Sequence, residues 1–337
     1  MSTTTHPRRT EVLPHEALWS LANAAAVSRS LQAVAELAVA DHIDDDPVAV
    51  EELARRCAVT VDGLDRVLRL LAAHGVFARR GPSYEHTETS RLLRSDHPMS
   101  MRPFVRMMGR PAFWASFGAL DHSIHTGAPG FEMVDRNGLW TYLRTHPEEA
   151  RVFDEAMTAK AQADIVAVLT AYDFGRFGTI ADIGGGRGHL LRAVLDRVPT
   201  ASGMLFDLPG VTETLDAVPP RLSLHPGDFF VDPLPRADAY VLMEVLHDWS
   251  DAEAAAILQA VRSAARPGAT LLIIEAIIPD GDLDPRVHAL DVIMLAVTGG
   301  RERTAPQLAS LLEGAGFRAT ATVETGSPIR ILEATAV

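Results

Sequence analysis

The stretch "ADIGGGRGHLLRAVL", Ala181–Leu195, places alternating glycines between a short apolar run and a run with helical periodicity. A strand that enters a glycine-rich turn and continues into a helix offers a ligand free backbone N–H groups and the positive end of a helix dipole. After this turn, short apolar segments alternate with helical ones, which predicts a parallel, doubly wound sheet. We therefore expect a nucleotide-like ligand at the turn, rather than a connection that binds nothing.

The spacing of the glycines distinguishes between possible ligands. The dinucleotide fingerprint G-x-G-x-x-G requires a third glycine where this chain has His189. The glycines are instead Gly184, Gly186 and Gly188, and Asp182 precedes them. A carboxylate there repels a pyrophosphate, but it accepts hydrogen bonds from an amino group and suits a cation. S-adenosylmethionine has a free amino acid group, a sulfonium and no phosphate, so it is the favoured ligand.

Acidic residues at the next two strand ends support the same ligand. Asp207 ends the second strand, where a carboxylate can accept hydrogen bonds from both ribose hydroxyls. After the third strand, "GDFF" offers Asp228 to the adenine amino group and Phe229 to cover the ring. An Asp at a strand end is equally often a helix cap. Their order along the chain nevertheless favours an adenosyl ligand.

A candidate base follows the fourth strand, which runs into "VLMEVLHDWSD". His247 lies there at the carboxyl edge of the predicted sheet, where ligands of open α/β folds bind. An imidazole with an ordinary pKa of about 6.5 serves as a general base near neutral pH. Glu275, at the end of the fifth strand, and Glu302, in "TGGRERT", are candidates to orient and stabilise it. The alternatives are a salt bridge for Glu275 and a solvated or capping charge for Glu302.

The composition limits the class of protein. The chain has 337 residues, 47% of them hydrophobic, a net charge of −13 and one cysteine, Cys57. An acidic chain argues against general nucleic-acid binding, and a single cysteine excludes internal disulfides and thiolate-rich metal sites. We expect a cytoplasmic protein without a membrane span. Arginine replaces lysine everywhere except at Lys160, which we attribute to coding bias.

Hydrophobic periodicity separates the chain into parts. We expect a disordered tail over 1–12, a winged helix over 13–100, connecting helices over 101–172 and a Rossmann-like α/β domain over 173–337. The winged helix combines two helices with a two-stranded wing in "GVFARRGPSYEHTETSRLL". The fold class is thus α/β, with a mostly helical domain in front of it.

These motifs together resemble a known family. The chain is similar to the S-adenosylmethionine-dependent O-methyltransferases of the plant caffeic-acid type and their bacterial natural-product (hydroxyneurosporene-type) relatives. The resemblance rests on "FDEAM", "DIGGGRG", "FDLP", "GDFF", "LHDWSD", "DVIMLAVTGGRERT" and "GAGF", and it spans nearly the whole chain. It implies S-adenosylmethionine as cofactor, S-adenosylhomocysteine as product, no metal, and a homodimer through the N-terminal domain.

The resemblance also implies roles for individual residues. The catalytic histidine falls on His247, and the two assisting glutamates fall on Glu275 and Glu302. The implied cofactor residues are Asp182, Gly184, Gly186, Gly188, Asp207, Leu208, Asp228, Phe229 and Met243. The implied acceptor pocket comprises Phe153, Met157, Trp249, Asp291, Met294 and Leu295. Plant members often have lysine at the position of Met243, so the adenine contact there is in question.

We therefore expect O-methylation of a phenolic hydroxyl on an aromatic or polyketide-like metabolite. One alternative keeps the cofactor for decarboxylation, hydroxylation or cyclisation, and another is carbon or nitrogen methylation. A winged-helix DNA-binding regulator is a third, but the presumed recognition helix in "DGLDRVLRLLAAHG" carries acids as well as cations. The sequence does not identify the acceptor.

Overall fold

The computed structural model describes residues 13–215, 218–279, 281 and 284–337, so the tail expected over 1–12 lies outside the described residues. The chain divides into two compact units, Met1–Gly109 and Arg110–Val337. None of the helices in the described part combines the length and the apolar character that a membrane span requires.

The first unit contains the winged helix. Its elements are α1 (Pro14–Ala22), α2 (Ala24–Glu36), η1 (Val39–His42), β1 (Val48–Ala49), α3 (Val50–Arg56), α4 (Val61–Ala73), β2 (Phe77–Arg80), β3 (Ser83–His86), α5 (Glu88–Arg91) and α6 (Arg102–Met108). The core forms because α4 buries Leu64, Leu68 and Leu71 at helical spacing. The expected two-stranded wing has a third strand, because β1 pairs antiparallel with β3.

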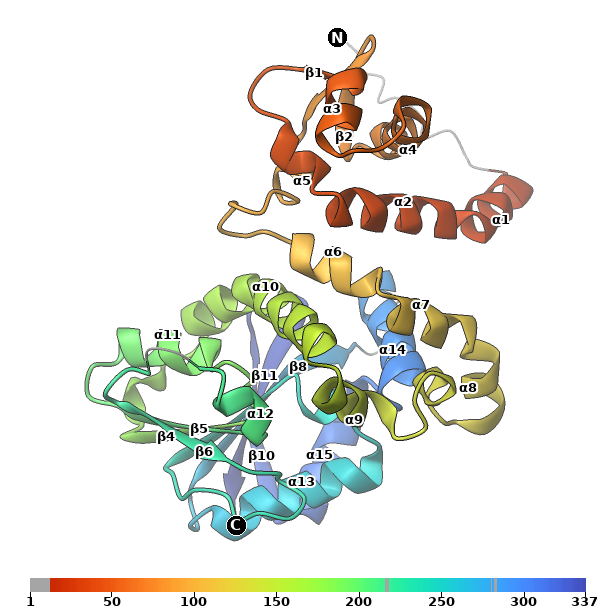
Figure 1. Ribbon diagram of the computed structural model, residues 1–337. Helices are drawn as coiled ribbons and strands as arrows, with labels where there is room; N and C mark the ends of the chain where they lie inside the picture. Colours follow the sequence, from red (N-terminus) through yellow and green to blue (C-terminus); the bar gives the residue numbers. More distant parts are fainter. Residues whose placement is uncertain (1–12, 216–217, 280, 282–283) are drawn as a thin grey trace, which may run out of the picture. The chain divides into compact units, whose positions relative to one another are not determined.

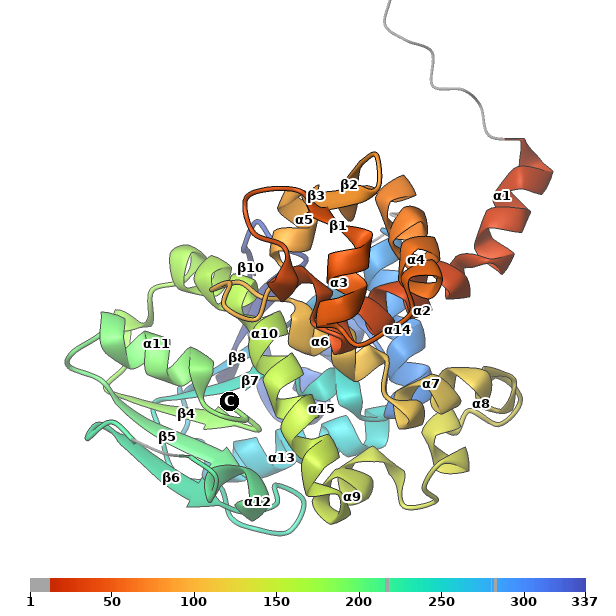
Figure 2. The same ribbon diagram turned by 45° about the horizontal axis from the view of Figure 1, so that its top comes forward.

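Helix α1 buries none of its residues. It extends from the end of α2, away from α3 and α4 (Figures 1 and 2). Leu18, Trp19 and Leu21 are 69%, 70% and 73% exposed, so an apolar surface on this helix is uncovered within the chain.

The second unit begins with helices and continues as an α/β domain. Its first elements are α7 (Pro111–Gly118), α8 (Leu120–Thr126), η2 (Gly130–Met133), α9 (Gly138–Thr145), α10 (Pro147–Ala171) and η3 (Phe174–Arg176). The alternating part comprises β4 (Thr179–Ile183), α11 (His189–Arg197), β5 (Ser202–Asp207), α12 (Pro209–Thr212), β6 (Leu222–Pro226), β7 (Ala239–Met243), η4 (Leu246–Asp248), α13 (Asp251–Ala264) and β8 (Thr270–Ile278). The last elements are α14 (Pro285–Val297), β9 (Arg303–Thr304), α15 (Ala305–Gly314), β10 (Phe317–Glu324) and β11 (Ile329–Ala336).

The sheet of this unit has the strand order β10-β11-β8-β7-β4-β5-β6 within the described ranges, with β9 beside the end of β8. Strands β4 to β8 run parallel, and the β10–β11 hairpin joins antiparallel to β8. One face packs against α13 and α15, and the other against α10 and α11 (Figure 1). Eight of the nine residues of β8 are buried, as a strand covered on both faces requires.

This topology fixes where a ligand binds. Strand β4 is first in the parallel order, and the chain then adds β5 and β6 on one side and β7 and β8 on the other. Such a switch point leaves a crevice at the carboxyl ends of the adjacent strands β4 and β7. The glycine turn and His247 follow those two strands.

Candidate active site

The glycine turn after β4 adopts backbone conformations that favour glycine. Gly186 and Gly188 have φ of 57° and 72°, in the left-handed region that side chains with a Cβ rarely adopt. Nothing lies within 4 Å of a Cβ placed on Gly186, so this part of the turn is open to close approach by a ligand. Gly188 is the N-cap residue of α11, and the helix dipole therefore starts at the turn.

Two carboxylates, those of Asp182 and Asp207, lie next to the glycine turn. Asp182 is 2% exposed, and its Oδ1 has no hydrogen-bond partner. Burial, together with the charge of Asp207, raises the pKa of Asp182 to about 7. Buried polar atoms are nearly always paired, so this oxygen is suited to a donor from a ligand, such as an amino group.

Asp207 accepts hydrogen bonds from the backbone N–H groups of Gly186 and Leu208, both at 2.7 Å. These bonds tie the end of β5 to the glycine turn. Each carboxylate oxygen has a second lone pair, so Asp207 can still accept from two hydroxyl groups.

The residues expected around an adenine ring, Asp228, Phe229 and Met243, differ in what they contact within the protein. Oδ1 of Asp228 accepts from the N–H of Phe230 at 2.9 Å, a turn contact that uses one of its oxygens. The Phe229 ring meets Phe230 and Trp249 edge to face, and it approaches the Cβ position of Gly184 at 3.6 Å. Met243, at the end of β7, is partly buried against the core beneath α10 and α11.

His247 lies in the short turn η4 after β7 and is 5% exposed. Its Nδ1 lies 2.8 Å from Oε1 of Glu302. Because an ionised carboxylate only accepts, Nδ1 donates and Nε2 is the nitrogen left for proton exchange. Glu275 does not contact the ring: its Oε1 accepts from the backbone N–H of His247 at 3.1 Å. Of the two glutamates, Glu302 is thus the one that hydrogen-bonds the imidazole ring, whereas Glu275 hydrogen-bonds the backbone beside it.

Neither glutamate is a solvated charge, since each is 1% exposed. Burial raises the pKa of Glu275 to about 7, in spite of the opposing effect of His247. Burial by itself lowers the pKa of His247, but Asp248, the Glu302 hydrogen bond and Glu275 outweigh it and raise that pKa to about 10. Without a ligand, the imidazole is thus protonated at neutral pH.

Sequence reasoning missed three charged groups next to His247. Oδ1 of Asp248 lies 3.9 Å from Nε2 of His247. Glu244, whose φ is 53°, forms an ion pair with Lys160 of α10. Lys160 is the only lysine of the chain, and its retention where arginine otherwise replaces lysine is the signal in the composition that could have indicated this ion pair. Among the described residues, no three or more His, Cys, Asp or Glu side chains are grouped so as to hold a metal ion.

Aromatic side chains lie beside this site. Trp249 stacks on Trp140 with ring centroids 6.0 Å apart, and Trp140 meets Phe153 edge to face at 5.8 Å. Met157 of α10 and Leu295 of α14 are half-buried. Two further residues expected in an acceptor pocket have contacts inside the protein. Met294 is buried beneath Thr298, and Oδ1 of Asp291 accepts from the backbone N–H of Glu302 at 2.8 Å.

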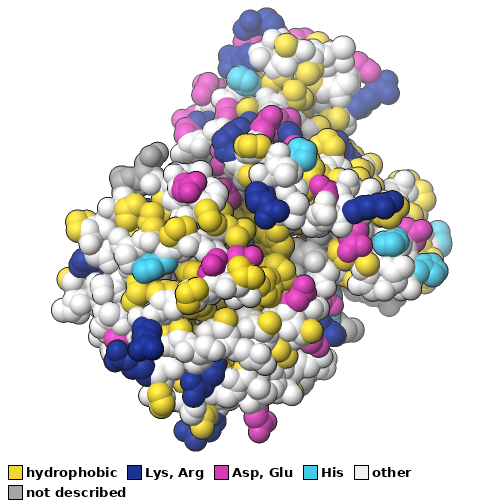
Figure 3. Space-filling view, turned by 60° about the horizontal axis from the view of Figure 1, so that its bottom comes forward, with side chains coloured by type: hydrophobic (Ala, Val, Ile, Leu, Met, Phe, Trp, Pro, Cys, Tyr) yellow, Lys and Arg dark blue, Asp and Glu magenta, His cyan; other side chains and the backbone are white. Residues whose placement is uncertain are grey.

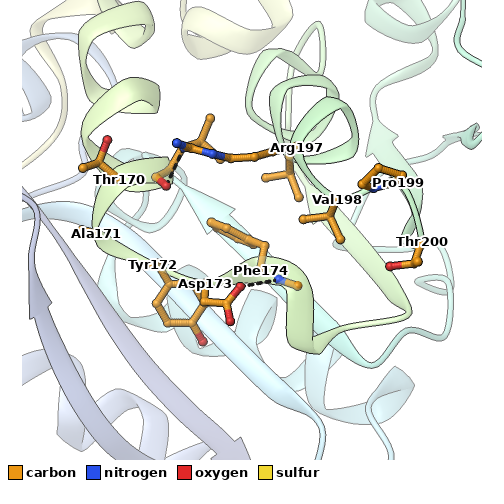
Figure 4. Close-up of a pocket in the computed structure, with 12 residues that line it drawn as sticks. Thr170, Ala171, Tyr172, Asp173, Phe174, Arg197, Val198, Pro199 and Thr200 are labelled. Carbon is orange, nitrogen blue, oxygen red and sulfur yellow. Dashed lines mark hydrogen bonds between the residues drawn. The ribbon is translucent and has the colours of Figure 1, made fainter.

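A separate open hollow of about 560 Å³ lies between the C-terminal ends of α10 and α11 (Figure 4). It is lined by residues such as Thr170, Phe174 and Arg197, and the Arg197 guanidinium donates to the Leu169 carbonyl at 2.7 Å. These residues precede β4 and β5, so the hollow lies at the amino edge of the sheet. Ligands of such sheets bind at the opposite edge, and His247 and the glycine turn lie there.

The chain matches known proteins over both units. Residues 19–96 match the model of an O-methyltransferase dimerisation domain, and residues 117–318 match that of an O-methyltransferase domain. The chain belongs to the S-adenosylmethionine-dependent O-methyltransferases. It is 38% identical to the phenazine O-methyltransferase of Lysobacter antibioticus, over 91% of this chain and 92% of that protein.

Two further relatives are an O-methyltransferase and an N,N-dimethyltransferase. An O-methyltransferase from neocarzinostatin biosynthesis, solved with S-adenosylmethionine and 2-hydroxy-5-methyl naphthoic acid, is 34% identical with a TM-score of 0.78, covering 93% of this chain and 96% of that one. The 8-amino-8-demethylriboflavin N,N-dimethyltransferase of Streptomyces davaonensis is 38% identical over 93% of this chain and 92% of that protein. The predicted family, fold class and cofactor are confirmed: the protein is a methyltransferase that uses S-adenosylmethionine. The turn at Gly186 and the unpaired Asp182 oxygen fit that cofactor.

Proposed function

We propose that this enzyme methylates a phenolic hydroxyl of an aromatic metabolite, with His247 as the general base. The observation that carries the proposal is the 2.8 Å contact between Nδ1 of His247 and the buried Glu302, beside aromatic side chains that suit a flat acceptor. When bound, S-adenosylmethionine supplies an activated methyl group on a positively charged sulfur.

His247 accepts the phenolic proton on Nε2, and Glu302 stabilises the imidazolium through Nδ1. A phenol has an ordinary pKa of about 10, close to the pKa of about 10 for His247. Because the ligand-free imidazole is protonated at neutral pH, it accepts the phenolic proton only after a nearby cation has lowered its pKa by like-charge repulsion. A cation beside the phenol lowers the pKa of the phenol as well, so proton transfer between the two groups stays close to balanced.

Residues at the sheet edge hold the cofactor in this proposal. Asp182 accepts from its amino group, Asp207 accepts from the ribose hydroxyls, and the turn from Gly184 to Gly188 surrounds the amino acid part. Asp228 and Phe229 contact the adenine ring. The acceptor contacts Phe153, Met157, Trp249 and Leu295 in this proposal. Asp291 and Met294 act indirectly, because each contacts another residue of the protein, Glu302 and Thr298 respectively.

The proposal also covers the macromolecular partners of the enzyme. We expect a homodimer, supported by the match to a dimerisation domain and the uncovered apolar surface of α1. We expect no nucleic-acid partner, because the net charge is −13. In the view of Figure 3, Lys and Arg side chains lie in small groups separated by acidic and apolar ones.

Nitrogen methylation is a second candidate, since a relative with 38% identity is an N,N-dimethyltransferase. A neutral arylamine is already nucleophilic and needs no base before attack, so His247→Asn should spare N-methylation and abolish O-methylation. The test is mass spectrometry of matched phenol and arylamine libraries with S-adenosylmethionine, scoring products about 14 mass units heavier. If His247→Asn methylates phenols as fast as the wild type, the base assignment is wrong.

A further inference from the structure

The segment Gly300–Arg303 lies against the turn that carries His247. A Cβ on Gly300 would come within 1.9 Å of the His247 carbonyl oxygen, so only glycine permits this approach. The N–H of Arg301 donates to that same carbonyl at 2.8 Å. The next residue, Glu302, contacts the His247 ring, so the backbone contact and the ring contact belong to one short segment.

Arg303 completes this arrangement from inside the protein. It is 1% exposed and is among the largest fully buried side chains in the described part of the chain. Its Nη1 donates to the Leu246 carbonyl at 2.8 Å, its Nη2 to the Trp249 carbonyl at 2.7 Å, and its Nε to Asp251 at 2.9 Å. The guanidinium thus holds the turn on both sides of His247. The β9–β8 pairing, in which Arg303 lies opposite Ile277, anchors its own backbone.

Burying an arginine is costly unless its donors are all well placed. Here the rigid fork meets two carbonyls that flank the candidate base, a geometry that a lysine cannot reproduce from one nitrogen. We propose that Arg303 is a positioning residue for the methyl transfer, which sets the distance between His247 and Glu302 by clamping the η4 turn to the Gly300–Arg303 segment. The inference rests on the proposed role of His247 as the base.

The direction in which the pKa of His247 should change when Arg303 is replaced follows from the charges around the imidazole ring. The carboxylates are Glu244 after β7, Asp248 in η4, Glu275 on β8 and Glu302 before β9, and the cations are Lys160 on α10 and Arg303 itself. Against the opposing effect of burial, Asp248, the Glu302 contact and Glu275 raise the pKa of His247 to about 10. If the clamp loosens, the ring loses the Glu302 contact and its pKa falls, while water that enters beside the ring offsets only part of this fall.

The test is an NMR titration of the whole protein carrying ¹⁵N-labelled histidine, with the His247 signal assigned by its absence in His247→Asn. Arg303→Lys should lower the proton affinity of His247 by about tenfold or more. This measurement needs neither an acceptor nor turnover. A shift in an enzyme that methylates no phenol would therefore leave the positioning role standing and remove only the proposed acceptor.

The control is Arg221→Lys. Arg221 likewise makes three side-chain hydrogen bonds, here to the carbonyls of Leu195, Val198 and Ala201, but it is exposed and lies at the amino edge of the sheet before β6. The Arg221→Lys substitution should leave the NMR titration of His247 unchanged. In turnover assays, Arg303→Lys should lower kcat by about 10²-fold, the cost of misplacing a reacting group by about 1 Å. The rising limb of its pH profile should move to lower pH, and its affinity for S-adenosylmethionine should be retained.

A folded Arg303→Lys with the wild-type titration would overturn the proposal, as would an equal shift in Arg221→Lys. If Arg303→Lys fails to fold, Asp251→Asn decides. The Asp251 side chain is 58% exposed, and its replacement releases one of the three anchors of Arg303 from the solvent side. A smaller shift in the same direction supports the clamp, and no shift contradicts it.

Discussion

The different contacts of Glu302 and Glu275 lead to a quantitative prediction. The two carboxylates are equally buried, yet Glu302 contacts the His247 ring and Glu275 contacts its backbone N–H. Glu302→Gln and Glu275→Gln are therefore a matched pair of isosteric changes at two equally buried carboxyl groups. We expect Glu302→Gln to be much the more damaging to turnover.

The magnitude follows from the geometry. An opposite charge in hydrogen-bond contact shifts a pKa by about 1–3 units, or roughly 1.4–4 kcal/mol. Glu302→Gln should lower the pKa of His247 by that amount, and loss of the orienting carboxylate should cost about 10²–10⁴-fold in kcat. Burial raises the pKa of Glu275 to about 7, so its protonated form is favoured far more than in an exposed glutamate. Gln mimics that protonated form, so the cost at Glu275 should stay below about tenfold.

The assay is the pH dependence of kcat for a phenol acceptor, with affinity for S-adenosylmethionine measured by calorimetry as the control for folding. The base must be deprotonated, so kcat rises with pH through the pKa of His247 in the complex. In Glu302→Gln the plateau should drop and the rising limb should move to lower pH. Equal losses in the two variants, or a larger loss in Glu275→Gln, would refute the assignment of the ring contact to Glu302.

Three further predictions concern the cofactor site and the dimer. Asp207→Ala removes the acceptor for the Gly186 and Leu208 N–H groups, so calorimetry should show cofactor affinity at least about tenfold weaker; unchanged affinity would contradict the role. The ligand-free protein keeps a proton on Asp182 up to a pKa of about 7, whereas the unfolded chain releases it near 3.8, so this contribution to stability is lost as pH rises between those values. The free energy of unfolding of Asp182→Asn, measured with denaturant, should therefore rise relative to that of the wild type by up to about 4 kcal/mol between pH 4 and pH 8. A difference between the two proteins that does not change with pH would contradict the raised pKa of this unpaired carboxylate. Trp19→Asp should convert the dimer to a monomer in light scattering, whereas Ile124→Asp, at an equally exposed apolar position of α8, should not; dimers in both variants would exclude the α1 surface.

The sequence predicted the position of several candidate site residues at the sheet edge, because the information for this position is local. Each glycine of the turn marks a backbone conformation that follows a strand, and the carboxyl ends of parallel strands meet at one edge of the sheet. Asp182, Asp207 and His247 therefore lie at that edge, as expected. The alternation of strands and helices likewise predicts the doubly wound class, because it too is a local property of the sequence.

Only the tertiary structure decided which side chains meet. Glu275 reaches the His247 backbone across 28 residues, and Glu302 reaches the ring across 55. The Lys160–Glu244 pair spans 84 residues, and the Arg303 contacts with Leu246 and Trp249 span 57 and 54. Such pairings depend on how α10, β8 and the segment before β9 pack over the sheet edge. No periodicity encodes them, because the fold brings these residues together through side-chain packing rather than through local backbone preference.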